Sequence, residues 1–300
     1  MKGEEKMKNK AFFSLVLSMV IFGTVGIFRR YIPLPSGFIA FSRGFIGFLF
    51  LAAFLFIKKI PLSKDILKKN FFALASSGML MGLNWILLFE AYNHTTVSAA
   101  TLCYYAAPVF VIFASPFLFG EKLGTKKLLC IPLSCFGMVL VSGIFEEKVS
   151  GINDLYGIFL ALGAAALYAS VVIINKSLSS VPPIEKTLVQ LGSSCFLVLP
   201  YSLIAEDFSA VGFSSESVVL LIVVGVLHTG IAYLLYFGSI GNLPAQTTAL
   251  FSYIDPVTAI VLSSLILDEK MTFYSIAGAI LILGSAIFGE KTKSKPSTGA

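Results

Sequence analysis

Long apolar segments alternate with short polar ones along the chain. Each apolar segment has about the 17–25 residues that a helix needs to cross the hydrocarbon region of a bilayer. We therefore predict ten membrane helices, at 11–28, 36–57, 71–92, 95–119, 125–143, 155–175, 186–204, 217–240, 244–267 and 272–289. The first segment is expected to be a retained helix rather than a cleavable signal, because another apolar segment follows it directly.

The composition supports this interpretation. The chain of 300 residues is 57% hydrophobic and only 13% charged. A soluble globular chain is usually about 45–50% apolar and about 25% charged. The excess of apolar residues exceeds what one core can hold, so lipid is expected to cover part of the surface.

The loop charges predict an orientation in the membrane. Most of the 22 Lys and Arg residues fall in tails and loops on one predicted side, whereas the loops on the other side are mainly acidic. Because basic loops stay in the cytoplasm, both termini are expected to be cytoplasmic. Arg29 and Arg30 are the exception, since they should face outward. The net charge of +6 is therefore explained by topology and does not indicate nucleic-acid binding.

The sequence also contains a repeat. When it is shifted by 148 positions, matching residues come into register, among them Tyr105 with Tyr253, Pro108 with Pro256, and the pair Glu121 and Lys122 with Glu269 and Lys270. Each copy holds five predicted spans, which is an odd number, so the second copy must cross the membrane upside down. The predicted fold is an all-α membrane protein of ten transmembrane helices in two inverted five-helix repeats, 11–143 and 155–289. Inverted repeats are common in secondary transporters.

The strongest motifs lie in the fourth and ninth spans. The first copy reads Thr101-Leu-Cys-Tyr-Tyr-Ala-Ala-Pro108 and then Phe119-Gly-Glu-Lys122; the second reads Ala249-Leu-Phe-Ser-Tyr-Ile-Asp-Pro256 and then Leu267-Asp-Glu-Lys270. With this repeat, the chain over about residues 11–289 resembles the EamA-type branch of the drug/metabolite transporter superfamily. Arg43 also fits the first repeat of that family. The resemblance implies transport of a small metabolite, such as an amino acid, a nucleotide sugar or a quaternary amine.

Pro108 and Pro256 lie midway along their spans. Proline removes a backbone donor and frees a carbonyl one turn earlier. In lipid, such a carbonyl must find a partner or line a cavity. Either proline alone is as well explained by a simple kink. The repeat relation favours a helix bend shared by both halves.

Asp255 departs from the small or apolar residue expected before the ninth-span proline. A carboxylate near the bilayer centre costs about 2.5–3.5 kcal/mol, so such residues usually serve a function. In a regular helix Asp255, Ser252 and Thr248 share one face, which predicts a polar stripe pointing inward. Asp255 can hold a proton or neutralise a cationic group of a substrate. The alternative is a structural hydrogen bond to a neighbouring helix.

His228 lies at a depth similar to that of Asp255 and is a candidate proton relay. A lone buried histidine is more often a packing residue. In a regular α-helix it would lie some 140° around the axis from Tyr233, so the two side chains should not face one cavity.

Aromatic residues are candidates for a cavity lining, because aromatic faces attract ammonium groups. Taken singly, each is better explained by packing than by ligand contact. Asn84 adds a neutral donor and acceptor. The aromatic candidates are Trp85, Tyr104, Tyr105, Tyr168, Tyr233 and Tyr253.

Arg43 and Glu90 both fall toward the outer side of their spans. Opposite charges in lipid tend to pair, so we expect a structural or gating pair in preference to direct substrate contact.

Other chemistry finds no support in the sequence. The four cysteines lack paired metal-ligand spacing, and no Walker loop, dinucleotide fingerprint, nucleophile elbow or HExxH motif is present. We therefore expect no cofactor, no metal and no enzymatic activity, so coupling would come from a gradient.

The first hypothesis is a secondary transporter of the cytoplasmic membrane that moves an amino acid or similar metabolite by alternating access, optionally coupled to protons through Asp255. The second is a transporter of an organic cation such as a choline-like amine. A third, of another class, is a non-transporting membrane subunit or a membrane enzyme. The expected partners are a small-molecule substrate, lipid and protons, with the chain as a monomer or homodimer.

Overall fold

A computed structural model describes residues 2–95, 97–121, 124–141, 152–206, 214–266 and 272–290, which form helices without any strand. The first half contains α1 (Lys2–Arg30), α2 (Ser36–Ile57), α3 (Lys64–His94), α4 (Val97–Tyr104), α5 (Ala107–Phe119) and α6 (Thr125–Val141). The second half contains α7 (Ile152–Ser177), α8 (Pro183–Ala205), α9 (Ser215–Val223), the π-helix η1 (Val224–Ile231), α10 (Ala232–Ile240), α11 (Ala245–Phe251), α12 (Ile254–Ile266) and α13 (Phe273–Glu290). Three repeat residues, Lys122, Glu269 and Lys270, lie outside the described ranges.

Eight helical segments of the described chain are long and apolar enough to cross a membrane. They correspond to eight of the ten spans predicted from the sequence. The other two, in α6 and α13, contain shorter apolar stretches at Leu128–Leu140 and Ile276–Ser285. These two helices pack against each other, and the hydroxyl groups of Ser134 and Ser285 meet at 2.6 Å. Their status as membrane spans stays a prediction.

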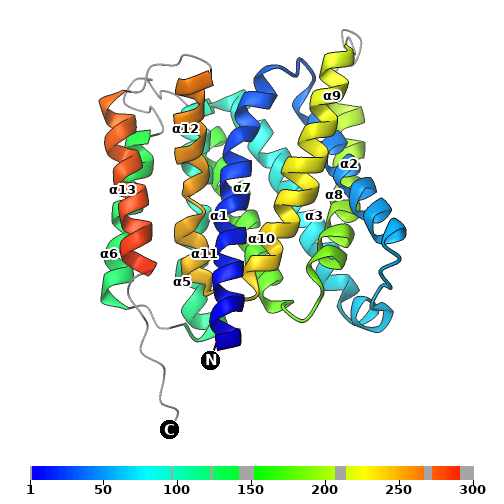
Figure 1. Ribbon diagram of the computed structural model, residues 1–300. Helices are drawn as coiled ribbons and strands as arrows, with labels where there is room; N and C mark the ends of the chain where they lie inside the picture. Colours follow the sequence, from blue (N-terminus) through cyan, green and yellow to red (C-terminus); the bar gives the residue numbers. More distant parts are fainter. Residues whose placement is uncertain are drawn as a thin grey trace.

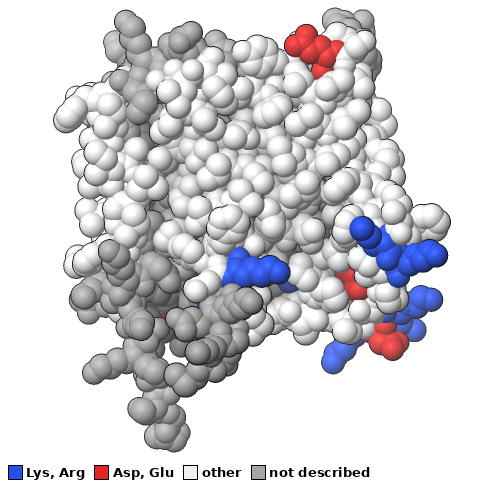
Figure 2. Space-filling model, in the orientation of Figure 1, with Lys and Arg blue, Asp and Glu red and all other residues white. Residues whose placement is uncertain are grey.

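The surface has the character of a lipid-facing belt. Large apolar side chains are almost fully exposed on several helices, with Phe56, Phe72 and Phe117 each more than 85% exposed. On the face shown in Figure 2, a broad central band carries no Lys, Arg, Asp or Glu, and the charged residues lie toward the two ends. A soluble protein rarely exposes so large an apolar surface. The chain is a multi-pass membrane protein.

The helices stand roughly side by side (Figure 1), and glycines set the closest approaches. α3 packs against α8 and α7. A Cβ at Gly78 would overlap the backbone of Gln190, and one at Gly82 would lie 3.0 Å from the carbonyl oxygen of Ser194. These two glycines, four residues apart, let α3 and α8 approach closely, as small residues do between membrane helices.

Two of the spans are broken, at equivalent points of the repeat. α4 ends at Tyr104 and α5 begins at Ala107, while α11 ends at Phe251 and α12 begins at Ile254. Pro108 and Pro256 lie in the first turns of α5 and α12. Proline lacks the N–H that would continue the helix but is well tolerated in a first turn, which explains why each break precedes its proline.

Helix packing is similar when the two halves are exchanged. In the repeat, α1 corresponds to α7, α2 to α8, and α3 to η1 with α10. α7 and α8 both pack on α3 of the first half, and in the same way α1 packs on α10 and η1, and α2 packs on η1, of the second half. The fourth span contacts the ninth through α5 and α11, and α6 contacts its own counterpart α13. The start of α1 and the end of α13 lie at the same end of the bundle (Figure 1).

Candidate functional site

A cavity of about 250 Å³ lies in the middle of the bundle, between helices from both halves. Its volume is below the 300–1,000 Å³ typical of sites for drug-sized ligands, which favours a small solute. The polar and charged residues of its wall are Arg43, Tyr92, Thr101, Tyr104, Tyr105, Tyr168, His228, Tyr233, Ser252 and Asp255.

Asp255 reaches the cavity from the first turn of α12, directly after the break in the ninth span. Its carboxyl group interacts with the side chain of Tyr105, from the equivalent break in the fourth span. α1 passes close behind, because a Cβ at Gly23 would lie 2.6 Å from the carbonyl oxygen of Asp255. Among the described wall residues, Asp255 is the only acidic one, and it lies where the two broken helices and α1 meet.

Arg43 reaches the cavity from α2. Its guanidinium lies 4.5 Å from the centre of the Trp85 ring, and its Nη2 donates to the Tyr233 hydroxyl at 3.4 Å. Its Nε is buried without a hydrogen-bond partner. An aromatic face and a phenol stabilise a guanidinium without neutralising it.

The expected pair of Arg43 with Glu90 does not form, so that prediction was wrong. The carboxylate of Glu90 instead contacts Asn93, His94 and Tyr201, at 3.2–3.3 Å. Both residues lie at similar depth in their helices, but depth alone does not fix the direction of a side chain around the helix axis. Arg43 points into the bundle cavity, whereas Glu90 lines a separate hollow.

That second hollow has a volume of about 580 Å³ and is lined by Pro35, Ser36, Phe89, Glu90, Asn93, Tyr201, Ala205 and Glu206. Glu206 holds the start of α2, because its carboxylate accepts from the backbone N–H groups of Gly37 and Phe38. Phe89 lines both hollows and so stands between them.

His228 and Tyr233 both face the cavity, contrary to the expectation from α-helical geometry. The cause is η1, in which the backbone bonds span five residues instead of four, so residues five apart come close to one face. The Nε2 of His228 lies 2.7 Å from the Thr24 hydroxyl, which itself donates to the carbonyl of Ile21. Since a hydroxyl has one hydrogen, we assign the hydrogen between them to Nε2.

Aromatic rings form much of the wall. Trp85 lies 6.5 Å from Tyr233, Phe22 lies 5.2 Å from Tyr233, and Tyr104 lies 5.8 Å from Tyr168, measured between ring centres. This wall is apolar enough for an aliphatic or aromatic substrate group and polarisable enough for a cationic one.

The structure brings most of the predicted site residues to this cavity: Arg43, Trp85, Tyr104, Tyr105, Pro108, His228, Tyr233, Ser252 and Asp255. Others support it from behind. The Asn84 carbonyl accepts from Tyr104 at 3.4 Å, and the Tyr253 hydroxyl donates to the backbone carbonyl of Tyr105 at 3.2 Å.

Thr248 and Pro256 do not line the cavity. The hydroxyl of Thr248 donates to the carbonyl of Pro244, and the hydroxyl of Ser252 donates to that of Thr248. Of the expected stripe of Thr248, Ser252 and Asp255, the last two reach the wall at and just after the helix break, whereas Thr248, one turn before Ser252, is fully buried.

Sequence reasoning missed the contribution of the first span, from which Met19, Phe22 and Val25 line the wall. The repeat could not point to them, since the matching positions begin only in the third span. The described chain contains no group of three or more His, Cys, Asp or Glu residues that could hold a metal ion.

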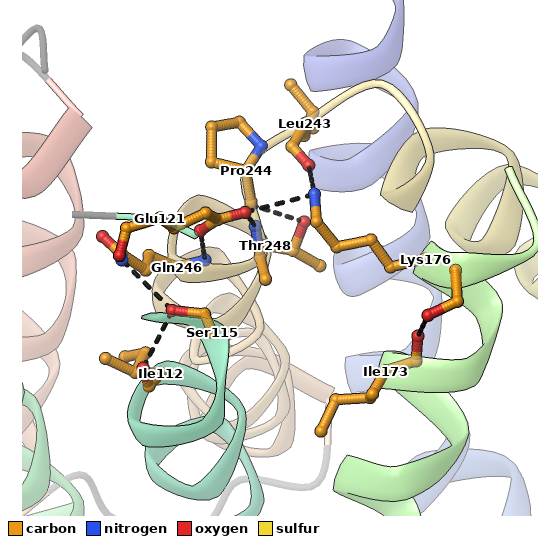
Figure 3. A network of polar contacts seen from close by, with 11 residues as sticks. Ile112, Ser115, Glu121, Ile173, Lys176, Leu243, Pro244, Gln246 and Thr248 are labelled. Carbon is orange, nitrogen blue, oxygen red and sulfur yellow. Dashed lines mark hydrogen bonds and ion pairs between the residues drawn. The ribbon is translucent and has the colours of Figure 1, made fainter. Parts of the chain in front are cut away.

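A polar network links the residues after α5 to the start of α11 and the end of α7 (Figure 3). The Glu121 carboxylate, which follows α5, accepts from the backbone N–H groups of Ala245 and Gln246 at 2.8 and 3.3 Å. It also lies 3.3 Å from the Nζ of Lys176, at the end of α7. Gln246 donates to Ser115 at 3.1 Å. We call Ser115, Glu121, Lys176 and Gln246 the seal.

Comparison with known proteins identifies this architecture. The EamA-like transporter family matches the chain twice, over residues 9–143 and 155–288. The chain belongs to the EamA-like transporter family. It is a transporter of the EamA type within the drug/metabolite transporter superfamily.

Relatives of this EamA-family chain are named as transporters. A Bacillus subtilis protein named uncharacterized transporter YxxF is 30% identical over 92% of this chain and 88% of its own. An Escherichia coli protein named probable amino-acid metabolite efflux pump is 27% identical over 67% of this chain and 71% of its own. One crystal structure aligns with a TM-score of 0.81 over 93% of this chain and 98% of that one, at 17% identity, and so shares the fold.

Proposed function

We propose that this EamA-family chain is a secondary transporter that moves an amino acid or a similar small metabolite across the cytoplasmic membrane by alternating access. Asp255 is the group that binds the cationic part of the substrate or carries a coupling proton. The observation that carries this proposal is the position of Asp255, which faces a central cavity at a helix break instead of lipid. A carboxylate at such a position is expensive and is usually functional.

Alternating access requires two halves that can exchange conformations. The matched packing of the halves, and the equivalent breaks before Pro108 and Pro256, support an arrangement of two inverted repeats. The seal supports the same mechanism, because Glu121 from the first half holds the start of α11 and the end of α7 from the second half. Breaking the seal would open the cavity toward the end at which α1 begins.

We place that end in the cytoplasm. Lysines at the end of α2 and the start of α3 lie on this side, as the positive-inside rule requires. A tag on the C-terminus should be labelled only after intact cells are permeabilised. Labelling from outside intact cells would reverse the orientation.

An amino-acid substrate is supported by the opposite charges of the cavity wall and by the name of the Escherichia coli relative. An organic cation is the second candidate. It is supported by Asp255 together with the aromatic faces of Trp85, Tyr104 and Tyr233, which attract ammonium groups.

Flux into vesicles that contain the purified chain tests both candidates. Zwitterionic amino acids and choline-like amines are offered as separate panels, at two pH values, with protein-free vesicles as the reference. We expect flux of the amino-acid panel that responds to a proton gradient. Flux of the amines alone would favour the second candidate, and flux of neither would contradict the proposed function.

A further inference from the structure

Arg43 places a positive charge in the wall of the cavity without a negative charge beside it. In the described part of the chain it has no acidic partner, and its contacts are the Trp85 ring and the Tyr233 hydroxyl. A guanidinium inside a membrane bundle is costly unless an anion or polar groups compensate it. The conformation of Arg43 therefore suits it to receive an anion from within the cavity.

Asp255 carries the opposite charge in the same wall. Arg43 and Asp255 do not form an ion pair across the cavity, although both line it. Two opposite charges that share a small cavity without contact are placed for a ligand that carries both complementary charges. Among the wall residues that the structure describes, His228 is the only other one that can become cationic, and its ring is already held by Thr24.

The remaining wall limits what else the ligand can carry. The same wall also contains aromatic and aliphatic residues, among them Phe22, Trp85, Leu88, Tyr104 and Tyr168. Beyond Asp255, the described wall offers no further carboxylate for a second cationic group of the ligand. A neutral, apolar side chain of the ligand would be buried against this wall, and removing its apolar surface from water would favour binding.

We propose that Arg43 binds the carboxylate of the substrate while Asp255 binds its ammonium group, so that the cavity selects zwitterionic amino acids with neutral side chains. This rests on the proposed function, because it takes the cavity to be the transport site. It assigns Arg43 to specificity, and not to a structural pair with Glu90. A guanidinium can hold a carboxylate through two parallel hydrogen bonds, which gives direction as well as attraction.

The chain provides its own probe for this binding. Trp85 is the only tryptophan among 300 residues, and it lines the cavity beneath Arg43. A ligand bound between Arg43 and Asp255 should therefore change the tryptophan fluorescence of the full-length protein in detergent. Leucine, leucinamide and 4-methylpentanoate form a matched set, because the last two each lack one of leucine's charged groups.

For the unaltered protein we expect leucine to bind at least about tenfold more tightly than leucinamide or 4-methylpentanoate, as lost hydrogen bonds to charged groups imply. Arg43→Gln should weaken leucine binding by about the same factor but leave leucinamide binding unchanged. Arg43→Lys, which keeps the charge, should retain part of the preference for leucine. Asp255→Asn should remove the preference for leucine over 4-methylpentanoate.

Folding is checked for each variant by its melting temperature and by its elution as a single species. If Arg43→Gln does not fold, the proposal is tested with Arg43→Lys and with the three ligands on the unaltered protein. Equal affinity of the unaltered protein for leucine and leucinamide overturns the proposal. An Arg43→Gln protein that keeps the leucine preference also overturns it, while vesicle flux would still support transport. A protein that binds choline but no zwitterionic amino acid overturns the role of Arg43. That result would support the second candidate function, a transporter of organic cations. Absence of flux for every solute contradicts the proposed function itself.

Discussion

The hydroxyl of Tyr253 donates a hydrogen bond to the backbone carbonyl of Tyr105, and the two residues are 148 positions apart, the offset of the sequence repeat. Each stands at the break of its own span, one in each half of the chain. The bond therefore joins the two broken helices directly behind Asp255. A backbone carbonyl released by a helix break needs such a partner in a membrane interior.

Removing this bond should destabilise the junction. We expect Tyr253→Phe to lower the free energy of unfolding by about 0.5–1.5 kcal/mol, the usual net contribution of one hydrogen bond. Thermal unfolding of the purified protein measures it. Tyr31→Phe is the matched control, because Tyr31 is 52% exposed, and it should leave the melting temperature unchanged. Equal melting temperatures for all three proteins would mean that the bond does not hold the junction.

Opening of the seal can be tested through Glu121. Glu121→Ala removes one ion pair and two charge-assisted hydrogen bonds between the halves, so the closed state should lose about 1–3 kcal/mol. A cysteine placed at buried Thr248 reports opening through its rate of maleimide labelling in a cysteine-free background. We expect the reporter cysteine to be labelled at least about tenfold faster in the Glu121→Ala protein than in the protein that keeps Glu121.

The control for the seal is Asp65→Ala, which removes an exposed carboxylate in the first turn of α3. It should not change the labelling rate at the same reporter. Equal rates in the Glu121→Ala and Asp65→Ala proteins would show that Glu121 does not hold this end closed.

The close approach of α3 and α8 makes a different prediction. Gly78→Ala places a methyl group against the backbone of Gln190, and backbone yields less easily than a flexible side chain. We expect a loss of about 1–3 kcal/mol of stability, as for other overpacked sites. Gly26→Ala is the control, because its Cβ would meet nothing within 4 Å, and it should be neutral or slightly stabilising. A Gly78→Ala protein as stable as Gly26→Ala would refute the tight contact.

The positions of the helices could be predicted from the sequence because lipid imposes a minimum length of apolar chain on every crossing helix. The eight long spans follow this rule, from Met7–Phe28 through Ala245–Ile266. Asp255 could also be found from sequence, since a carboxylate in an apolar segment is rare and costly. Family membership followed from the repeated motifs around Pro108 and Pro256 and is confirmed by the match over both halves.

The directions of side chains could not be predicted in the same way. Similar depth in the membrane suggests a pair of Arg43 with Glu90, but the position of Arg43 around the axis of α2 directs it toward Trp85. A helix with 3.6 residues per turn would direct His228 and Tyr233 to different sides, whereas η1 brings both to the cavity. A π-helical turn leaves no clear sequence pattern, because it depends on how the helix packs against its neighbours.

The central claim, that Asp255 is the functional carboxylate of a transport cavity, is tested most directly by solute flux into vesicles containing the Asp255→Asn protein. The substitution keeps the shape of the side chain and removes its charge, so the protein should fold with an unchanged elution profile. We predict that proton-dependent or cation-dependent flux falls to the level of protein-free vesicles. Flux equal to that of the unaltered protein, with the same response to a proton gradient, would contradict the role of Asp255.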